Sequence, residues 1–259
     1  MEPEFMWFKE RCIECRDCQN VCVNGAISFE SSSLLLDYNK CNICGACVKV
    51  CTPQAIELIG KKKTVDQVMN EIAKDIIFYD ESGGGVTFSG GEPLMQPDFL
   101  YILLKKCKGR RIHTALDTSG YADPDVLLKI RKYVDLFLYD VKVINDSKHI
   151  KFTGVSNKII LKNLRNLSSN RRKIIIRFPL IPSVNDDEKD ILDLGLFVSS
   201  LKNVNELDIL PYHKVGIEKF QRLLKPKDLF FESQPPSTEK LAEIREKLEK
   251  FGLKVKIGG

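Results

Sequence analysis

Residues 112–141 read IHTALDTSGYADPDVLLKIRKYVDLFLYDV and decide the fold class of this 259-residue chain. The segment opens with an apolar run at 112–117 and closes with another at 136–141, and both have the composition of β-strands. Between them, Asp123 followed by Pro124 predicts a helix start, because an N-cap residue precedes proline at the first helical position. A strand, a helix and a further strand form one βαβ unit, so we expect two parallel strands here.

The same alternation of short apolar strands and helical stretches continues on both sides of this unit. Further strands are predicted at 86–89, 174–180, 207–210 and 254–257. Helical spacing marks the connecting segments, as at Leu241 and Ile244 in a last helix that is predicted to stop at Gly252. Repeated βα units predict one parallel sheet, which is either doubly wound or barrel-like.

Two more helices are predicted before and after the first of these strands. Thr64 and Gln67 form a T-x-x-Q capping box, and apolar residues then follow at helical spacing as far as Ile76. Another helical face is formed by Leu100, Leu103, Leu104 and Cys107. Because Cys107 shares that apolar face, we expect a buried and inert thiol there.

Composition and charge bound the possible functions. With 43% hydrophobic residues, the chain can build one large domain and a small additional one. The sequence contains no run of about 18 apolar residues, so no membrane-spanning helix is predicted. The formal net charge is +5, and basic clusters at 61–63, 108–111 and 171–173 lie between periodic segments. Solvated loops explain these clusters better than a nucleic-acid surface does.

Eight of the nine cysteines fall in two copies of the pattern C-x2-C-x2-C-x3-C, and each residue of the second copy lies 29 positions after its counterpart. This spacing is typical of two-cluster ferredoxins, in which the fourth cysteine of each run binds the other cluster. We therefore expect two [4Fe–4S] clusters, one held by Cys12, Cys15, Cys18 and Cys51 and the other by Cys41, Cys44, Cys47 and Cys22.

Two other uses of cysteine fit this pattern less well. Disulfide frameworks are typical of small secreted domains, and nothing before Cys12 resembles a signal peptide. Structural zinc takes two C-x2-C pairs per ion and does not require a third cysteine two residues further on.

Val23 departs from the ferredoxin pattern, because proline usually follows the fourth cysteine. Reduced cysteines in clusters predict a reducing, oxygen-poor cytoplasm as the location.

Polar and charged residues follow the predicted strands at the ends where a parallel barrel carries its chemistry. In chain order these are SGGEP at 89–93, DTSG at 117–120, DVK at 140–142, Arg177, and PYH at 211–213. Each has an ordinary structural explanation by itself, such as a turn at Gly90 and Gly91 or a helix cap at Asp117. Five such groups at five successive strand ends favour a shared site.

Residues 84–94, GGVTFSGGEPL, resemble the signature of the glycyl radical enzyme activating enzymes, a family of radical S-adenosylmethionine (SAM) proteins. Further motifs match in the family's order, namely LDTSG at 116–120, YDVK at 139–142, TGVSN at 153–157 and LPYH at 210–213. Some members carry a two-cluster ferredoxin insert just before the glycine-rich strand, as here. The resemblance implies a two-cluster ferredoxin-like domain at 1–62 and a partial radical SAM (β/α) barrel, lacking its first strand, at 63–259.

The resemblance places SAM across the strand ends of the barrel. The residues that it implies for SAM binding are Gly90, Gly91, Glu92, Asp117, Thr118, Asp140, Val141, Lys142, Arg177 and His213. The two glycines would let the backbone approach the methionyl amino group, Glu92 would pair with it, and Lys142 would lie near the methionyl carboxylate. Asp117 and Thr118 would order this wall around a monovalent cation.

The resemblance also implies a reaction and partners. The family reaction is one-electron reductive cleavage of SAM, after which the 5′-deoxyadenosyl radical takes hydrogen from a glycine Cα of a partner enzyme. The cofactor supplies this chemistry, and the protein supplies orientation and excludes water. The implied partners are a glycyl radical enzyme and an electron donor of the flavodoxin or ferredoxin type, with no nucleic acid and no membrane.

One family motif is missing from the sequence. The catalytic [4Fe–4S] cluster of the family is held by C-x3-C-x2-C, and neither cysteine run can supply it, because Gly25 and Gln54 stand where its third cysteine would be. The sequence therefore allows three hypotheses. In the first hypothesis, the chain is an activating enzyme that is inactive as given, because the catalytic cluster, its third, is present only in a longer form. Alternatively, it is an electron-transfer or binding protein with two [4Fe–4S] clusters, or it belongs to another radical SAM class, such as a peptide-modifying maturase.

Overall fold

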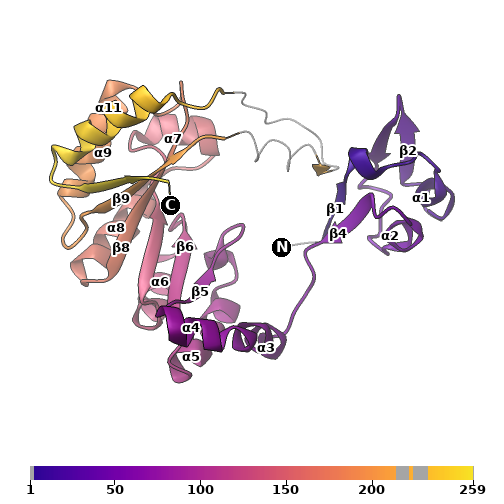
Figure 1. Cartoon of the computed structure of the whole chain (residues 1–259), viewed down its shortest axis with the longest axis horizontal. Helices are drawn as coiled ribbons and strands as arrows, with labels where there is room; N and C mark the ends of the chain where they lie inside the picture. The colour runs from indigo at the N-terminus through magenta and orange to yellow at the C-terminus, as the bar shows by residue number, and fades with distance from the viewer. Residues whose placement is uncertain (1–2, 214–221, 224–232, 259) are drawn as a thin grey trace. The chain divides into compact units, whose positions relative to one another are not determined.

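The computed structural model describes residues 3–213, 222–223 and 233–258. They divide into two compact units (Figure 1). The first unit comprises Met1–Lys62 and His213–Glu232, and the second comprises Lys63–Tyr212 and Ser233–Gly259. Each unit has a hydrophobic core of its own, so the two are described separately.

The first unit consists of two small antiparallel sheets and short helices. β1 (Glu4–Trp7) pairs with β4 (Ile56–Ile59), and β2 (Ile27–Glu30) pairs with β3 (Ser33–Leu36). The helical segments are η1 (Lys9–Arg11), α1 (Asp17–Asn20) and α2 (Ala46–Val50). Of the described residues beyond the predicted boundary, His213, Arg222 and Leu223 group with the first unit. There, Leu223 bridges to Met6, and Arg222 donates to Glu10 at 3.1 Å.

The 29-residue repeat of the cysteines extends through the backbone of this unit. β3 begins 29 residues after β1, as α2 does after α1 and β4 after β2. Residues with left-handed backbone conformation recur at the same interval, in the pairs Glu14 and Ile43 (φ 54° and 57°), Arg16 and Gly45 (63° and 75°), and Gly25 and Gln54 (57° and 53°). The first unit is therefore built from two copies of one backbone motif.

The second unit is built on a sheet of six parallel strands in the order β10-β9-β8-β7-β6-β5. The strands are β5 (Gly85–Phe88), β6 (His113–Thr118), β7 (Leu136–Asp140), β8 (Lys173–Leu180), β9 (Glu206–Pro211) and β10 (Lys254–Ile257). All six were predicted, with ends that differ by at most one residue. Because the spatial order follows the chain order, the sheet lacks the order reversal that defines a doubly wound sheet.

Helices connect the strands and, in Figure 1, lie along the outside of the sheet. They are α3 (Val65–Lys74), α4 (Ile76–Ser82), α5 (Pro97–Gly109), α6 (Pro124–Ile130), α7 (Asp146–Thr153), α8 (Lys158–Ser169), α9 (Glu188–Ser199) and α11 (Thr238–Glu249), with short 3₁₀ turns η2 (Pro93–Met95) and η3 (Arg131–Tyr133). Parallel strands with right-handed crossovers in one direction return every helix to the same face of the sheet.

The strands alternate between a helix-covered face and an opposite, polar face. The helix-covered face carries fully buried side chains, including Leu116, Tyr139, Ile176 and Ile209. Residues adjacent to these on the same strands point the other way and carry half-buried charges, namely Asp117, Asp140, Arg177 and Asp208. Because side chains alternate along a strand, burying one set in the core directs the charged set to the opposite face.

Local details of the helices agree with most of the predictions. The Thr64 capping box is present, with the Gln67 amide donating to the Thr64 hydroxyl oxygen at 3.2 Å and the Thr64 amide donating to Gln67 at 2.8 Å. Cys107 is buried, as predicted, 3.9 Å from the sulfur of Met69. The continuous helix expected to reach Ile76 is wrong, because α3 ends at Lys74 and Ile76 begins α4.

The last helix ends shortly before the glycine that was predicted to stop it. α11 ends at Glu249, and the chain then turns through Gly252, which has a φ of 77°. Among the described residues, no helix is both long and apolar enough to cross a membrane.

Candidate functional site

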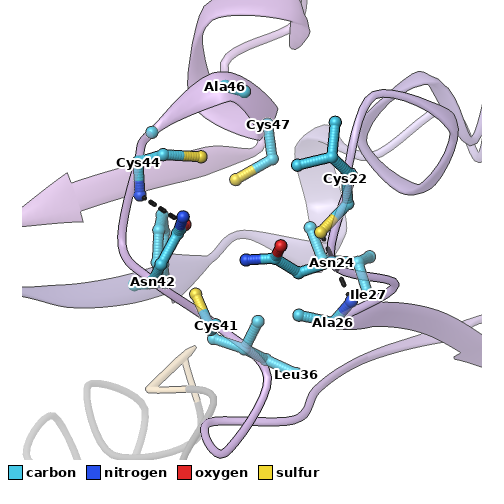
Figure 2. Close-up of a pocket in the computed structure, with 13 residues that line it drawn as sticks. Cys22, Asn24, Ala26, Ile27, Leu36, Cys41, Asn42, Cys44, Ala46 and Cys47 are labelled. Atoms are coloured by element: carbon cyan, nitrogen blue, oxygen red, sulfur yellow. Dashed lines mark hydrogen bonds between the residues drawn. The ribbon is translucent and has the colours of Figure 1, made fainter.

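Two cavities in the first unit are each lined by four cysteines that come from both halves of the repeat. The cavity in Figure 2 is lined by Cys22, Cys41, Cys44 and Cys47. The other is lined by Cys12, Cys15, Cys18 and Cys51. These are the two crossed sets that the spacing predicts. None of the nine cysteines forms a disulfide.

Backbone amides point at sulfur atoms in both cavities. The Ala26 amide donates to Cys22 Sγ at 3.3 Å, and the Ala55 amide donates to Cys51 Sγ at 3.2 Å. These two contacts are counterparts in the repeat and involve the fourth cysteine of each run. Hydrogen bonds to the ligating sulfurs are among the features that tune iron–sulfur clusters in proteins.

Burial disfavours the thiolate form of the two innermost cysteines. Burial raises the pKa of Cys18 and of Cys47 to about 11, so both remain thiols at neutral pH in the absence of a cation. Metal binding replaces such protons. Four cysteines lining each cavity and amide donors to sulfur together fit an iron–sulfur cluster in each cavity.

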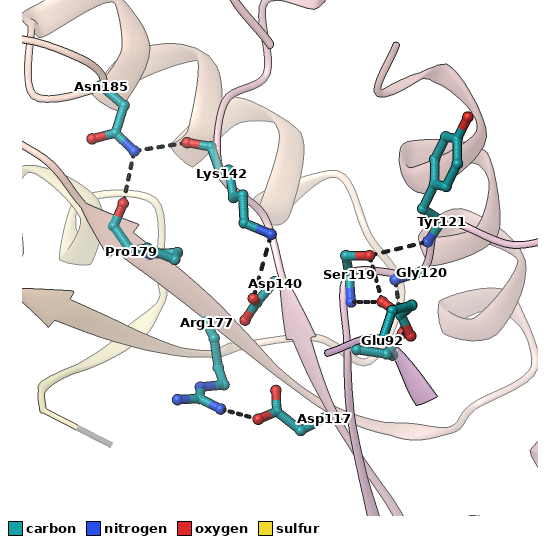
Figure 3. A network of polar contacts seen from close by, with 11 residues as sticks. Glu92, Asp117, Ser119, Gly120, Tyr121, Asp140, Lys142, Arg177, Pro179 and Asn185 are labelled. Carbon is teal, nitrogen blue, oxygen red and sulfur yellow. Dashed lines mark hydrogen bonds and ion pairs between the residues drawn. The ribbon is translucent and has the colours of Figure 1, made fainter. Parts of the chain in front are cut away.

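A second group of polar residues lies in the other unit, at the carboxyl ends of the parallel strands (Figure 3). The Glu92 carboxylate joins two loops there. Its Oε1 accepts from the Thr118 hydroxyl at 2.6 Å and from the Leu94 amide at 3.1 Å. Its Oε2 accepts from the Ser119 amide at 2.9 Å and from the Ser119 hydroxyl at 2.5 Å. A carboxylate has about four acceptor positions, so Glu92 is fully engaged by the protein.

The backbone beside Glu92 is open and shaped by glycine. Gly90 and Gly91 are exposed and have φ values of 88° and 53°. Residues other than glycine rarely adopt this left-handed backbone conformation. Because glycine has no side chain, these positions suit a loop whose backbone approaches a ligand closely. Val141 is buried, and its amide donates to the Arg177 carbonyl at 2.9 Å, which ties the end of β7 to β8.

Charged side chains on the polar face of the sheet form two pairs, one between β8 and β6 and one at the end of β7. Arg177 Nη1 donates to Asp117 Oδ2 at 2.6 Å, and Lys142 Nζ lies 3.6 Å from Asp140 Oδ2 (Figure 3). Burial raises the pKa of Asp140, although the positive charge of Lys142 opposes this shift. Fixed charges of both signs in a half-buried setting suit a zwitterionic ligand, because each of its charges can meet an opposite one.

The structure brings nine of the ten predicted SAM residues onto this edge of one unit. His213 is the exception, because it is exposed and belongs to the first unit. It follows Tyr212, whose amide donates to the Leu180 carbonyl at 3.0 Å.

Several residues at this edge were not predicted from the sequence. Asp208 lies directly opposite Arg177 in the register of β8 and β9, and burial raises its pKa. Its position between Leu207 and Ile209 is a detectable signal, since a charge there must face away from the core. Asn163 and Asn185 are buried and bind loop carbonyls, and no local sequence pattern marks them.

Comparison with known proteins identifies the family. The model of the Radical SAM superfamily matches residues 39–195. The trans-4-hydroxy-L-proline dehydratase activating enzyme of Clostridioides difficile is 42% identical over 259 residues, 99% of this chain and 85% of that protein. The choline trimethylamine-lyase activating enzyme of Oleidesulfovibrio alaskensis is 41% identical over 223 residues, 83% of this chain and 72% of that protein.

A solved structure gives the same result. A domain of the pyruvate-formate lyase-activating enzyme from Bacteroides vulgatus superposes with a TM-score of 0.57 at 36% identity, covering 68% of this chain and 99% of that chain. The sequence similarity to activating enzymes thus extends over nearly the whole chain, and the shared fold extends over two thirds of it. The chain therefore belongs to the radical SAM superfamily, among the activating enzymes of glycyl radical enzymes.

Proposed function

We propose that this protein serves the activation of a glycyl radical enzyme. In this reaction one electron and SAM give methionine and a 5′-deoxyadenosyl radical, which takes a hydrogen atom from a glycine Cα of the partner. The products are 5′-deoxyadenosine and the glycyl radical. The observation that carries the proposal is the cluster of charged residues and glycines at one edge of the sheet in a chain 42% identical to an activating enzyme.

The domain organisation follows from the same proposal. A two-cluster ferredoxin-like domain at 1–62 is supported by the duplicated backbone and the two cysteine-lined cavities. A partial radical SAM (β/α) barrel at 63–259 is supported by six parallel strands in chain order, since this order closes toward a barrel. A flavodoxin or ferredoxin-type protein would supply the electron, and oxygen-sensitive clusters favour a reducing cytoplasm.

SAM would bind at the carboxyl edge of the second unit. Its methionyl ammonium would meet the open backbone at Gly90 and Gly91 beside Glu92, and its carboxylate would meet Lys142. Glu92 would act mainly by holding the glycine-rich loop against Ser119, because its oxygens are already engaged. When bound, SAM supplies the sulfonium bond that is cleaved, while these residues orient it and exclude water.

Replacing Lys142 by methionine should weaken SAM binding roughly tenfold or more, because one charge-assisted contact to the carboxylate is lost. Isothermal titration calorimetry of the anaerobic chain with SAM measures the effect. Lys129→Met is the matched control, since Lys129 pairs with Asp98 at 3.0 Å between two outer helices, and it should bind SAM like the wild type. Equal dissociation constants for Lys142→Met and the wild type would contradict the assignment of this edge.

The second candidate function is electron transfer without SAM cleavage. The observation that favours it is that eight cysteines form the two crossed sets and the ninth, Cys107, is buried elsewhere, so the sequence holds no C-x3-C-x2-C motif for a third cluster. We propose accordingly that the 259-residue chain by itself does not cleave SAM.

Anaerobic reconstitution of this chain should yield about eight irons per chain, as expected for two [4Fe–4S] clusters. Incubation with dithionite and SAM should yield no 5′-deoxyadenosine, because no cysteine set remains to hold a cluster that chelates SAM. Iron analysis and liquid chromatography measure both quantities. Formation of 5′-deoxyadenosine by the purified chain would show that the inactivity proposal is wrong.

A further inference from the structure

Three asparagine side chains are buried in the second unit. No other asparagine among the described residues is buried. Asn157, Asn163 and Asn185 are 2%, 1% and 1% exposed. Asn157 immediately precedes α8, Asn163 lies within it, and Asn185 lies between β8 and α9. A buried amide requires partners, and here the partners are backbone carbonyls of the loops that follow the strands.

Two of these asparagines hold the loop that follows β7. Asn185 Nδ2 donates to the carbonyls of Lys142 and Pro179, both at 2.8 Å (Figure 3). Asn157 Nδ2 donates to the carbonyls of 143–144, also at 2.8 Å. Three successive carbonyls are thus occupied by side-chain amides. The backbone that carries the Lys142 ammonium is fixed at each of these peptides, and it is tied to the end of β8.

The third asparagine holds the loop that follows β6. Asn163 Nδ2 donates to the carbonyl of Gly120 at 3.0 Å and to that of Ala122 at 2.8 Å. This loop directly follows Thr118 and Ser119, the two residues that bind the Glu92 carboxylate. A side-chain NH₂ has two donors, so each asparagine can bridge two carbonyls in the way that no hydroxyl or carboxylate can.

We infer that Asn157, Asn163 and Asn185 are positioning residues, which set the loops of the SAM-binding edge before the ligand arrives. The inference rests on the proposed binding of SAM at this edge. A loop that is already ordered loses less conformational entropy when the ligand binds, so preorganisation increases affinity. Asn185 acts through Lys142, whose peptide it holds, and therefore the contributions of these two residues to SAM binding are coupled.

The test is a double-mutant cycle on SAM affinity in the anaerobic, reconstituted chain. Asn185→Ala should raise the dissociation constant of SAM about tenfold, with Asn185→Ser, which keeps one donor, in between. In the Lys142→Met background, Asn185→Ala should have a much smaller effect, because the side chain that it positions is gone. Amide hydrogen exchange at 141–145 should be faster in Asn185→Ala. Asn170→Ala is the control, since Asn170 is exposed and binds only the Asn166 carbonyl, at 2.7 Å.

Three outcomes are distinguishable. A wild-type chain that does not bind SAM overturns the proposed function of the edge. Wild-type binding together with unchanged affinity of Asn185→Ala overturns the positioning role alone. Additive effects of Asn185→Ala and Lys142→Met, or affinity losses that disappear after correction for the folded fraction, also overturn it, because a purely structural role predicts both. A coupled effect at full folding supports the inference.

Discussion

Replacing Cys22 and Cys41 together by alanine should leave about four irons per reconstituted chain, whereas replacing Cys22 and Cys12 together should leave almost none. This difference is expected because each cavity is lined by cysteines from both runs. Cys22 and Cys41 line the same cavity, so the first pair damages one cluster. Cys12 lines the other cavity, so the second pair damages both. Iron analysis and the electron paramagnetic resonance of the reduced protein measure the remaining clusters.

The control for this experiment is Cys107→Ala, which should keep the full iron content because Cys107 is buried in the second unit. Ligand sets that follow the chain, with each run serving one cluster, predict the reverse result. In that case the Cys22 and Cys41 pair would lose both clusters, and the Cys22 and Cys12 pair would lose one. Such a reversal would refute the crossed arrangement.

Gly120→Ala should destabilise the second unit by about 3 kcal/mol or more, since two costs add. Gly120 has a φ of 71°, and a Cβ atom at this position would lie 1.7 Å from the Tyr139 hydroxyl oxygen. Tyr139 cannot move aside easily, because it is fully buried and its hydroxyl donates to the Ile160 carbonyl at 2.7 Å. Thermal unfolding followed by circular dichroism should show a Tm lower by about 10 °C.

The variant Gly154→Ala separates the cost of the left-handed backbone conformation from the cost of the steric clash. Gly154 has a φ of 79°, and no atom lies within 4 Å of its added Cβ, so only the backbone cost of about 1 kcal/mol applies. A similar Tm for the two variants would show that the contact with Tyr139 costs nothing. Gly120→Ala should also weaken SAM binding, because the 120–122 segment continues directly from the residues that hold Glu92.

Much of the fold could be predicted because its signals are local. The strand at 254–257 was predicted with its observed ends, and the Thr64 capping box is present, since both depend on neighbouring residues. The break at Asp75 was missed because neither glycine nor proline marks it, and Asp75 ends one helix and begins the next with a φ of −100°. The periodicity up to Ile76 was real, but it crossed two helices.

The site could be predicted only in part, because many of its contacts join distant segments. Glu92 was selected from its motif, but its hydrogen bond with Ser119, 27 residues later, could not be predicted. Asn163 and Asn185 each bind a carbonyl 43 residues earlier in the chain, a separation at which spacing carries no information. Asp140 and Lys142 were selected because both stand at the end of one strand, where the fold class itself predicts function.

The pairing of strands in the first unit has a consequence for its history. β1 belongs to the first copy of the repeat but pairs with β4 of the second, and β2 pairs with β3 across the copies in the same way. Each cavity likewise takes three cysteines from one copy and one from the other. A tandem duplication can ordinarily be reversed by deleting one copy. Here the loss of either copy would leave two unpaired strands and no complete set of ligands, so this duplication has become irreversible.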